Sequence, residues 1–128
     1  MDGPSTGHDE IARQVVDAAF AVHVALGPGL LESVYEQCLA YELETRNLRV
    51  ARQVALPVQY REIRLDAGFR IDLIVNDLVI VEIKAIEKTL PIHEAQLLTY
   101  LKLSALRLGL LINFNVPKIK DGIRRLAL

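Results

Sequence analysis

The sequence has little of what secreted and membrane proteins use. It contains a single cysteine, Cys38, so no internal disulfide can form. No apolar run reaches the roughly 18 residues that a membrane helix needs, and no charged-then-apolar leader opens the chain. We therefore expect a soluble, intracellular protein, placed in the cytoplasm and without membrane contact.

Net charge is also nearly absent, with 15 lysines and arginines against 16 aspartates and glutamates. The whole surface therefore cannot attract nucleic acid, and any such contact must come from a local patch. What the chain has is apolar residues, 52% of its 128 positions, which is typical of a globular domain with one core. We expect a loose N-terminus over residues 1–7 and a single domain over residues 8–128.

Helical spacing of apolar residues predicts helices over residues 8–26, 30–45 and 91–105. Thr6 and Asp9 resemble a capping pair for the first helix, and the Gly27–Pro28–Gly29 segment ends it. Pro91 occupies a favoured first position of the third helix. Cys38 lies in the apolar stripe of the second, where we expect a core thiol.

Strand patterns cover residues 48–60, 69–75, 78–84 and 106–114, with a short last strand over residues 123–128. Pro57 indicates an edge position or a bulge, while residues 61–66 are polar and turn-like and residues 115–122 form a basic loop. The strand over residues 106–114 is almost wholly apolar, so we expect it inside the sheet. The order ααβββαβ(β) predicts an α/β or α+β fold with helices packed on a sheet.

A hairpin joined by Asn76–Asp77 carries Asp72, Glu82 and Lys84 inside two apolar runs. Strand alternation puts Glu82 and Lys84 on the face opposite the core residues Val79, Val81 and Ile83. The same alternation puts Asp72 opposite a second apolar set: Phe69, Ile71, Leu73 and Val75.

Two neighbouring carboxylates suit Mg²⁺ or Mn²⁺, and a lysine beside them can orient a water or stabilise a transition state. The alternative for these three residues is an exposed cross-strand ion pair.

The helices offer further candidates. His93, Gln96 and Tyr100 line one side of the third helix and suit hydrogen bonds to metal-site residues, phosphate or a base. Glu32, in the first turn of the second helix, has two open interpretations: a charge favoured by the helix dipole, or a third acidic metal ligand. Alternatives stay open for the others, with His93 as a solvated residue and Tyr35 and Tyr100 as core aromatics with satisfied hydroxyls.

Basic residues gather in two groups, which are either solvated faces or a one-sided footprint for nucleic acid. They are Arg46, Arg49, Arg52, Arg61 and Arg64 around the first strands, and Lys118, Lys120, Arg124 and Arg125 at the end.

Four motifs together resemble a known family. Residues 29–35, GLLESVY, look like the GxxExxY signature of the small bacterial proteins named for it, which are grouped with the PD-(D/E)xK nucleases near the RecB-type and resolvase-type enzymes. Asp72 with the Glu82-Ile83-Lys84 tripeptide matches the superfamily's acid followed by ExK, and residues 96–100 match its QxxxY helix motif. Residues 110–114 and 122–125 resemble the family's usual ending. The resemblance covers residues 8–125, with Ile71 in place of the proline that names the superfamily.

The resemblance implies a restriction-endonuclease-like core, a mixed central sheet flanked by helices. It implies a catalytic trio of Asp72, Glu82 and Lys84, with Gln96 and Tyr100 in support. Glu32, Asp72 and Glu82 would bind one or two Mg²⁺ or Mn²⁺ ions, and Ile83 would add its backbone carbonyl. We expect substrate contacts from Tyr35, His93, Arg124 and Arg125.

We therefore expect a metal-dependent nuclease that hydrolyses phosphodiester bonds, with DNA favoured as the substrate. Because the chain has no room for an added recognition domain, a homodimer or a partner protein would supply substrate selection. Two alternatives stay open: a catalytically inactive module of the same fold that binds nucleic acid or serves as a scaffold, and an RNA-directed nuclease.

Overall fold

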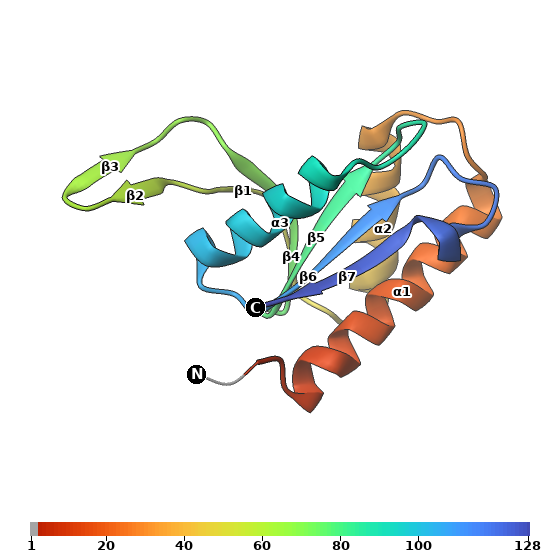
Figure 1. Ribbon diagram of the computed structural model, residues 1–128. Coiled ribbons are helices and arrows are strands. Elements are labelled where there is room, and N and C mark those ends of the chain that lie inside the picture. The colour runs from red at the N-terminus through yellow and green to blue at the C-terminus, as the bar shows by residue number, and fades with distance from the viewer. Residues whose placement is uncertain (1–2) are drawn as a thin grey trace.

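A mixed sheet of five strands forms the centre of the computed structural model, which describes residues 3–128 (Figure 1). Its strands lie in the order β1-β4-β5-β6-β7, and β5 and β6 are parallel while the other neighbours are antiparallel. The prediction of a mixed sheet with flanking helices is confirmed. The elements are α1 (Thr6–Leu26), α2 (Glu32–Thr45), β1 (Val50–Ala55), β2 (Val58–Tyr60), β3 (Ile63–Leu65), β4 (Arg70–Val75), β5 (Val79–Lys84), α3 (Pro91–Ser104), β6 (Leu108–Asn113), the 3₁₀ helix η1 (Ile119–Gly122) and β7 (Ile123–Ala127).

Helices cover both faces of this sheet. Side chains of α1 and α2 form one core cluster with Val79, Val81 and Ile83 of β5, as strand alternation predicts. A second cluster joins Leu97 of α3 to Ile80 of β5. The face that carries Glu82 is therefore not open to solvent along its length, because α3 packs on it. All six residues of β6 are buried, which confirms the prediction of an internal strand.

The N-terminal cap of α1 lies one residue earlier than predicted. Ser5 is the cap: its hydroxyl accepts the His8 N–H, and the His8 ring accepts the Ser5 N–H at 3.0 Å. The proposed Thr6–Asp9 pair is wrong because Thr6 is already helical. Helix α1 thus begins inside the predicted loose segment 1–7, of which Met1 and Asp2 lie outside the described residues. Helix α2 begins at Glu32 because Leu31 is extended, with φ −68° and ψ 147°.

Residues 58–65 form a separate hairpin, the β2–β3 arm, which projects from the body of the molecule (Figure 1). The prediction of one strand over residues 48–60 and a turn over residues 61–66 is wrong. The chain leaves the main sheet at Pro57, which has no N–H to continue a ladder, and it turns back at Arg61, where φ is 53°. Pro57 was expected at an edge position or a bulge; it lies outside both strands, between the end of β1, an edge strand of the main sheet, and the start of β2.

The hairpin of β4 and β5 is confirmed, with Asn76 and Asp77 at φ 51° and 57°, as a two-residue type I′ turn requires. Its ladder extends from the turn only as far as the pair of Leu73 and Val81. Beyond that pair Ile71 packs on the α3 side, although Leu73 packs on the α1 and α2 side. The prediction that these two residues share a face is wrong because the strand departs from regular alternation between them.

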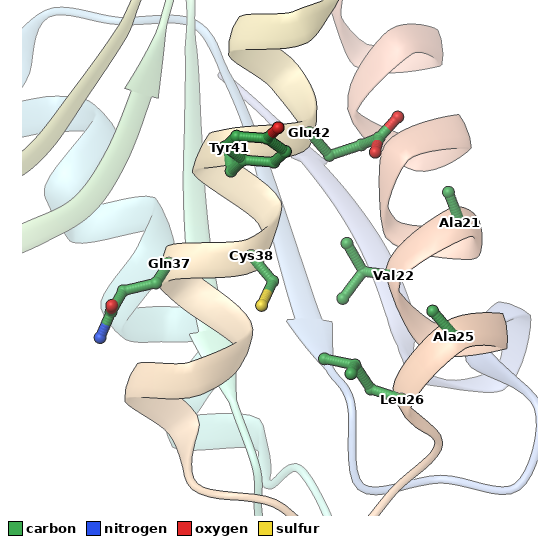
Figure 2. A pocket seen from close by; sticks show the side chains of 8 residues that line it. All are labelled: Ala21, Val22, Ala25, Leu26, Gln37, Cys38, Tyr41 and Glu42. Atoms are coloured by element: carbon green, nitrogen blue, oxygen red, sulfur yellow. The ribbon is translucent and has the colours of Figure 1, made fainter.

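Between α1 and α2 lies an apolar groove of about 290 Å³ (Figure 2). Cys38 borders it and packs in part against the core, so the expected core thiol is only half buried. Exposed Tyr41 lines the same groove, on the helical side of the molecule. No helix within residues 3–128 is long and apolar enough to cross a membrane.

Candidate active site

Asp72 and Glu82 meet where the ladder of β4 and β5 ends. The backbone N–H of Asp72 donates to Oε2 of Glu82 at 2.8 Å, and the backbone N–H of Ile83 donates to Oδ2 of Asp72 at 2.8 Å. Each carboxylate thus binds the backbone of the opposite strand and takes the place of a ladder hydrogen bond. Glu82 is only 6% exposed and Asp72 is half buried, so an acid pair lies among the buried apolar side chains at this end of the hairpin.

Burial dominates the electrostatics of this acid pair. Together with the neighbouring charge of Asp72 it raises the pKa of Glu82 to about 8, against the opposing effects of the Asp72 amide and Lys84. Burial also raises the pKa of Asp72, although the Ile83 amide and the Gln53 side chain favour its charged form. The charged forms repel each other in a poorly solvated place. Without a cation, the pair therefore retains a proton near neutral pH.

Glu32 faces the acid pair from the first turn of α2. Partial burial of its carboxylate, followed by the charge of Asp72, raises the pKa of Glu32, while Lys84 and the backbone amide of Ala85 lower it. Within residues 3–128, however, no group of three or more His, Cys, Asp and Glu side chains gathers closely enough to hold a metal. The compact acidic unit is therefore the pair of Asp72 and Glu82, with Glu32 at its border.

Lys84 follows Glu82 by two residues and is half buried. It lowers the pKa of all three carboxylates, so its ammonium lies near them. Among the residues that the structure describes, the ammonium forms no ion pair within 4.0 Å and no side-chain hydrogen bond, whereas the Lys84 carbonyl accepts the Phe114 N–H at 2.9 Å. The ammonium therefore keeps its donors available for a ligand.

Asn113 fixes the backbone that follows Lys84. Buried and opposite Lys84 in the β5–β6 register, it donates from Nδ2 to the Ile86 carbonyl at 2.9 Å and accepts the Ile86 N–H at 3.1 Å. No sequence pattern assigned a role to this residue. A buried amide at the end of an otherwise apolar strand was the signal that could have found it.

Helix α3 brings Tyr100 to the acid pair. Burial raises the pKa of Tyr100, and the charges of Glu82 and Asp72 raise it further, which places its hydroxyl in their field. Gln96, one turn earlier, is half buried, and its side chain makes no hydrogen bond within residues 3–128. His93 lies at the helix start, where its Nδ1 accepts the Leu90 N–H at 2.8 Å. Of the predicted stripe, His93 therefore caps the helix, whereas Gln96 and Tyr100 lie farther along it.

A second polar network supports Asp72 from the outside, and sequence reasoning missed it. Nearly buried Glu36 accepts hydrogen bonds from Arg52 at 3.1 Å and from Gln53 at 2.6 Å. Gln53 also reaches Oδ1 of Asp72 at 3.3 Å. At Gln53 the strand has φ 51°, so the side chain departs from the regular alternation of a strand. The signal available was Glu36 itself, which follows Glu32 by one helical turn.

Tyr35 lies in the core and not in the site. It is fully buried, stacks on Phe114 with ring centroids 4.6 Å apart, and uses its hydroxyl within the protein. That hydroxyl donates to the Gly27 carbonyl at 2.6 Å and accepts the Leu30 N–H at 3.1 Å. Tyr35 is therefore the core aromatic with a satisfied hydroxyl that was the alternative interpretation. Its two hydrogen bonds hold the loop that leads to Glu32.

The two arginines of β7 lie on opposite faces of the sheet. Arg125 forms an ion pair with Asp9 of α1, on the side away from α3. Arg124 lies opposite Leu111, which packs under α3 and is itself the β6 neighbour of Glu82. One intervening strand therefore separates Arg124 from the acid pair, and Arg125 does not face the pair.

The mixed sheet flanked by helices agrees with a restriction-endonuclease-like core. The acid pair lies where the ladder of β4 and β5 ends, and Lys84 follows Glu82 by two residues. The chain belongs to the PD-(D/E)XK nuclease superfamily, whose family model matches residues 9–126. Comparisons with curated proteins and with solved structures found no match.

The role of Tyr35 can be tested by removing its hydroxyl in Tyr35→Phe. Because two hydrogen bonds to the Gly27–Leu30 loop are lost while the stacked ring stays, we expect the free energy of unfolding to fall by about 1–2 kcal/mol. Urea denaturation measures this change, and DNA affinity should not change. Unaltered stability with weakened DNA binding would instead assign Tyr35 to the substrate.

The acid pair should make the metal-free protein less stable as pH rises. The pKa of Glu82 is raised in the folded state, so its contribution is complete below its unfolded value of 4.5 and is lost as pH rises through about 8. In EDTA the Tm of the wild type should fall between about pH 5 and 8, whereas Glu82→Gln should show a flatter profile. The exposed control Glu44→Gln should follow the wild type. Parallel profiles for wild type and Glu82→Gln would contradict this assignment.

Proposed function

We propose that this protein is a metal-dependent nuclease that hydrolyses phosphodiester bonds, with DNA as the favoured substrate and Mg²⁺ or Mn²⁺ as cofactor. The reciprocal backbone hydrogen bonds of Asp72 and Glu82 carry the proposal, because they hold two carboxylates together where burial disfavours their charge. Membership of a nuclease superfamily supports a nucleic-acid substrate. The segment from Gly29 to Tyr35 favours the GxxExxY group within it.

The donor set fits a hard cation. Asp72 and Glu82 each use one carboxylate oxygen for a backbone amide, and Oε1 of Glu82 makes no hydrogen bond in the described part of the chain. Ile83 directs its carbonyl to the same side as its amide, towards Asp72. Superfamily members typically use divalent metals, and Mg²⁺ is commonly held by one or two protein carboxylates together with water and phosphate oxygens.

Asp72, Glu82 and the Ile83 carbonyl would hold the ion. Glu32 would add a third carboxylate only by approaching the pair from α2, because the three do not gather closely enough within residues 3–128. When bound, the ion would supply an acidified water and stabilise negative charge on the phosphoryl oxygens. A bound ion would take the place of the proton on the acid pair, because carboxylate ligands bind a metal in their charged form.

The remaining residues handle the water and the phosphate. Lys84, with its donors available, would orient the attacking water or donate to a phosphoryl oxygen as charge develops. Tyr100 would donate its hydroxyl at the acid pair, and Gln96 would offer its amide from the same helix. The Asn113 bonds hold the segment after Lys84 in place, which limits how far the ammonium can move.

Substitution of Lys84 by alanine tests the mechanism. We expect cleavage of DNA to fall by at least about 100-fold, because a positioned proton-transfer group contributes roughly that factor or more. Circular dichroism and Mn²⁺ affinity should stay near the wild type. The exposed lysine four residues on gives a matched control, Lys88→Ala, which should retain activity. Wild-type cleavage by both Lys84→Ala and Asp72→Ala would contradict the mechanism.

The substrate panel for this assay separates the alternatives. Single-stranded, double-stranded and branched DNA, together with RNA, are incubated with the protein in Mg²⁺ or Mn²⁺. Cleavage of RNA alone would favour the RNA-directed alternative. Binding without cleavage of any of them would favour the inactive module.

A further inference from the structure

The β2–β3 arm begins beside the candidate active site. The chain leaves the sheet after β1, forms the arm and returns as β4, whose first residue, Arg70, precedes Asp72 by two positions (Figure 1). Backbone pairing of Ala55 with Arg70 ties both ends of the arm to that edge of the sheet. A polymer that reaches the acid pair across this edge therefore passes the arm.

The segment around the arm, residues 49–70, is positively charged, although the chain as a whole is not. Residues 49–70 carry five arginines against Glu62 and Asp66, a net charge of +3, whereas the whole chain carries −1, which leaves −4 for the remainder. Arg49 and Arg52 pair with acids elsewhere in the fold, and Arg64 pairs with Asp66 at 3.7 Å. The other two, Arg61 and Arg70, lie at the tip of the arm and at its return.

One face of the arm is apolar and exposed. The register pairs Tyr60 with Ile63 and Val58 with Leu65, so these side chains share a face, while Gln59 and Arg64 share the other. Tyr60 is 61% exposed, Ile63 55% and Leu65 51%. Contiguous exposed apolar side chains mark a contact surface, and a two-stranded hairpin alone is marginally stable.

The tip of the arm is held in one arrangement. The Gln59 amide donates to the Arg61 carbonyl at 2.6 Å, and the Arg61 guanidinium lies 5.4 Å from the centre of the Tyr60 ring. An exposed aromatic ring beside an arginine is a combination on which an unpaired base can stack while its phosphate binds the cation. A duplex keeps its bases stacked on one another and offers this surface only its backbone.

We propose that the β2–β3 arm binds single-stranded nucleic acid, with a base stacked on Tyr60 and the adjoining phosphate bound by Arg61. The arm thereby leads an unpaired strand to the acid pair. That second part rests on the proposed nuclease function, whereas binding by the arm does not.

Fluorescence anisotropy tests the arm in EDTA, where cleavage cannot interfere, with labelled single-stranded DNA and the matching duplex. The wild type should bind the single strand more tightly. Tyr60→Ala should weaken that binding about tenfold, the loss expected for one stacked base, and Tyr60→Phe should restore it. The replacement Arg61→Gln should reduce the slope of log Kd against log salt by about 0.7, because one phosphate contact is removed.

Tyr41→Ala is the matched control, since Tyr41 is 70% exposed on the helical side (Figure 2). It should bind as the wild type does, and all variants should keep the wild-type Tm because the arm lies outside both core clusters. Equal affinity of Tyr60→Ala and the wild type would overturn the proposal. So would a wild-type dimer in sedimentation that Tyr60→Ala converts to a monomer, because a second copy would then cover the apolar face. Binding that depends on the arm in a protein that cleaves nothing would support the arm and reject the nuclease.

Discussion

The site depends on two reciprocal hydrogen bonds between β4 and β5. The Glu82 carboxylate accepts the Asp72 N–H, and the Asp72 carboxylate accepts the Ile83 N–H. A carboxylate moved out of water is costly unless hydrogen bonds or opposite charge compensate it. Here backbone amides supply part of that compensation, and the raised pKa of Glu82 shows that they do not supply all of it. The surrounding helices and strands hold this incompletely compensated acid pair in place.

Three features fix the geometry of the acid pair. The type I′ turn at Asn76–Asp77 sets the register of β4 and β5, so that Asp72 and Glu82 meet beyond the last ladder pair. The crossover through α3 makes β5 and β6 parallel, and α3 carries Tyr100, whose pKa the charges of the acid pair raise. On the other side α2 contributes Glu32 at the border of the pair. The site is thus built from elements that the core clusters already hold rigid.

Much of this could be predicted from local patterns. Apolar spacing located the helices, and the Asn–Asp turn located the hairpin, because both signals come from residues close together in the chain. Asp72, Glu82 and Lys84 were evident as charges inside apolar runs. Tyr100 was evident from helical spacing, although its distance from the acids depends on how α3 crosses the sheet.

Other features depend on contacts between distant residues. Ile71 changes face because side chains replace the ladder at Asp72, which strand alternation does not include. Gln53 reaches Asp72 through a backbone conformation that its residue type does not favour. Tyr35 matches a family motif, yet its hydroxyl is used by a loop that the sequence shows only as glycine and proline.

The central claim is that Asp72 and Glu82 form a cation site whose proton is exchanged for the metal. Calorimetric titration of Mn²⁺ near pH 7, repeated in buffers of different ionisation enthalpy, measures both binding and proton release. The account predicts that the wild type binds Mn²⁺ with release of protons, and that Glu82→Gln and Asp72→Asn lose the binding while remaining folded. Equal Mn²⁺ affinity in these variants, or binding without proton release, would contradict it.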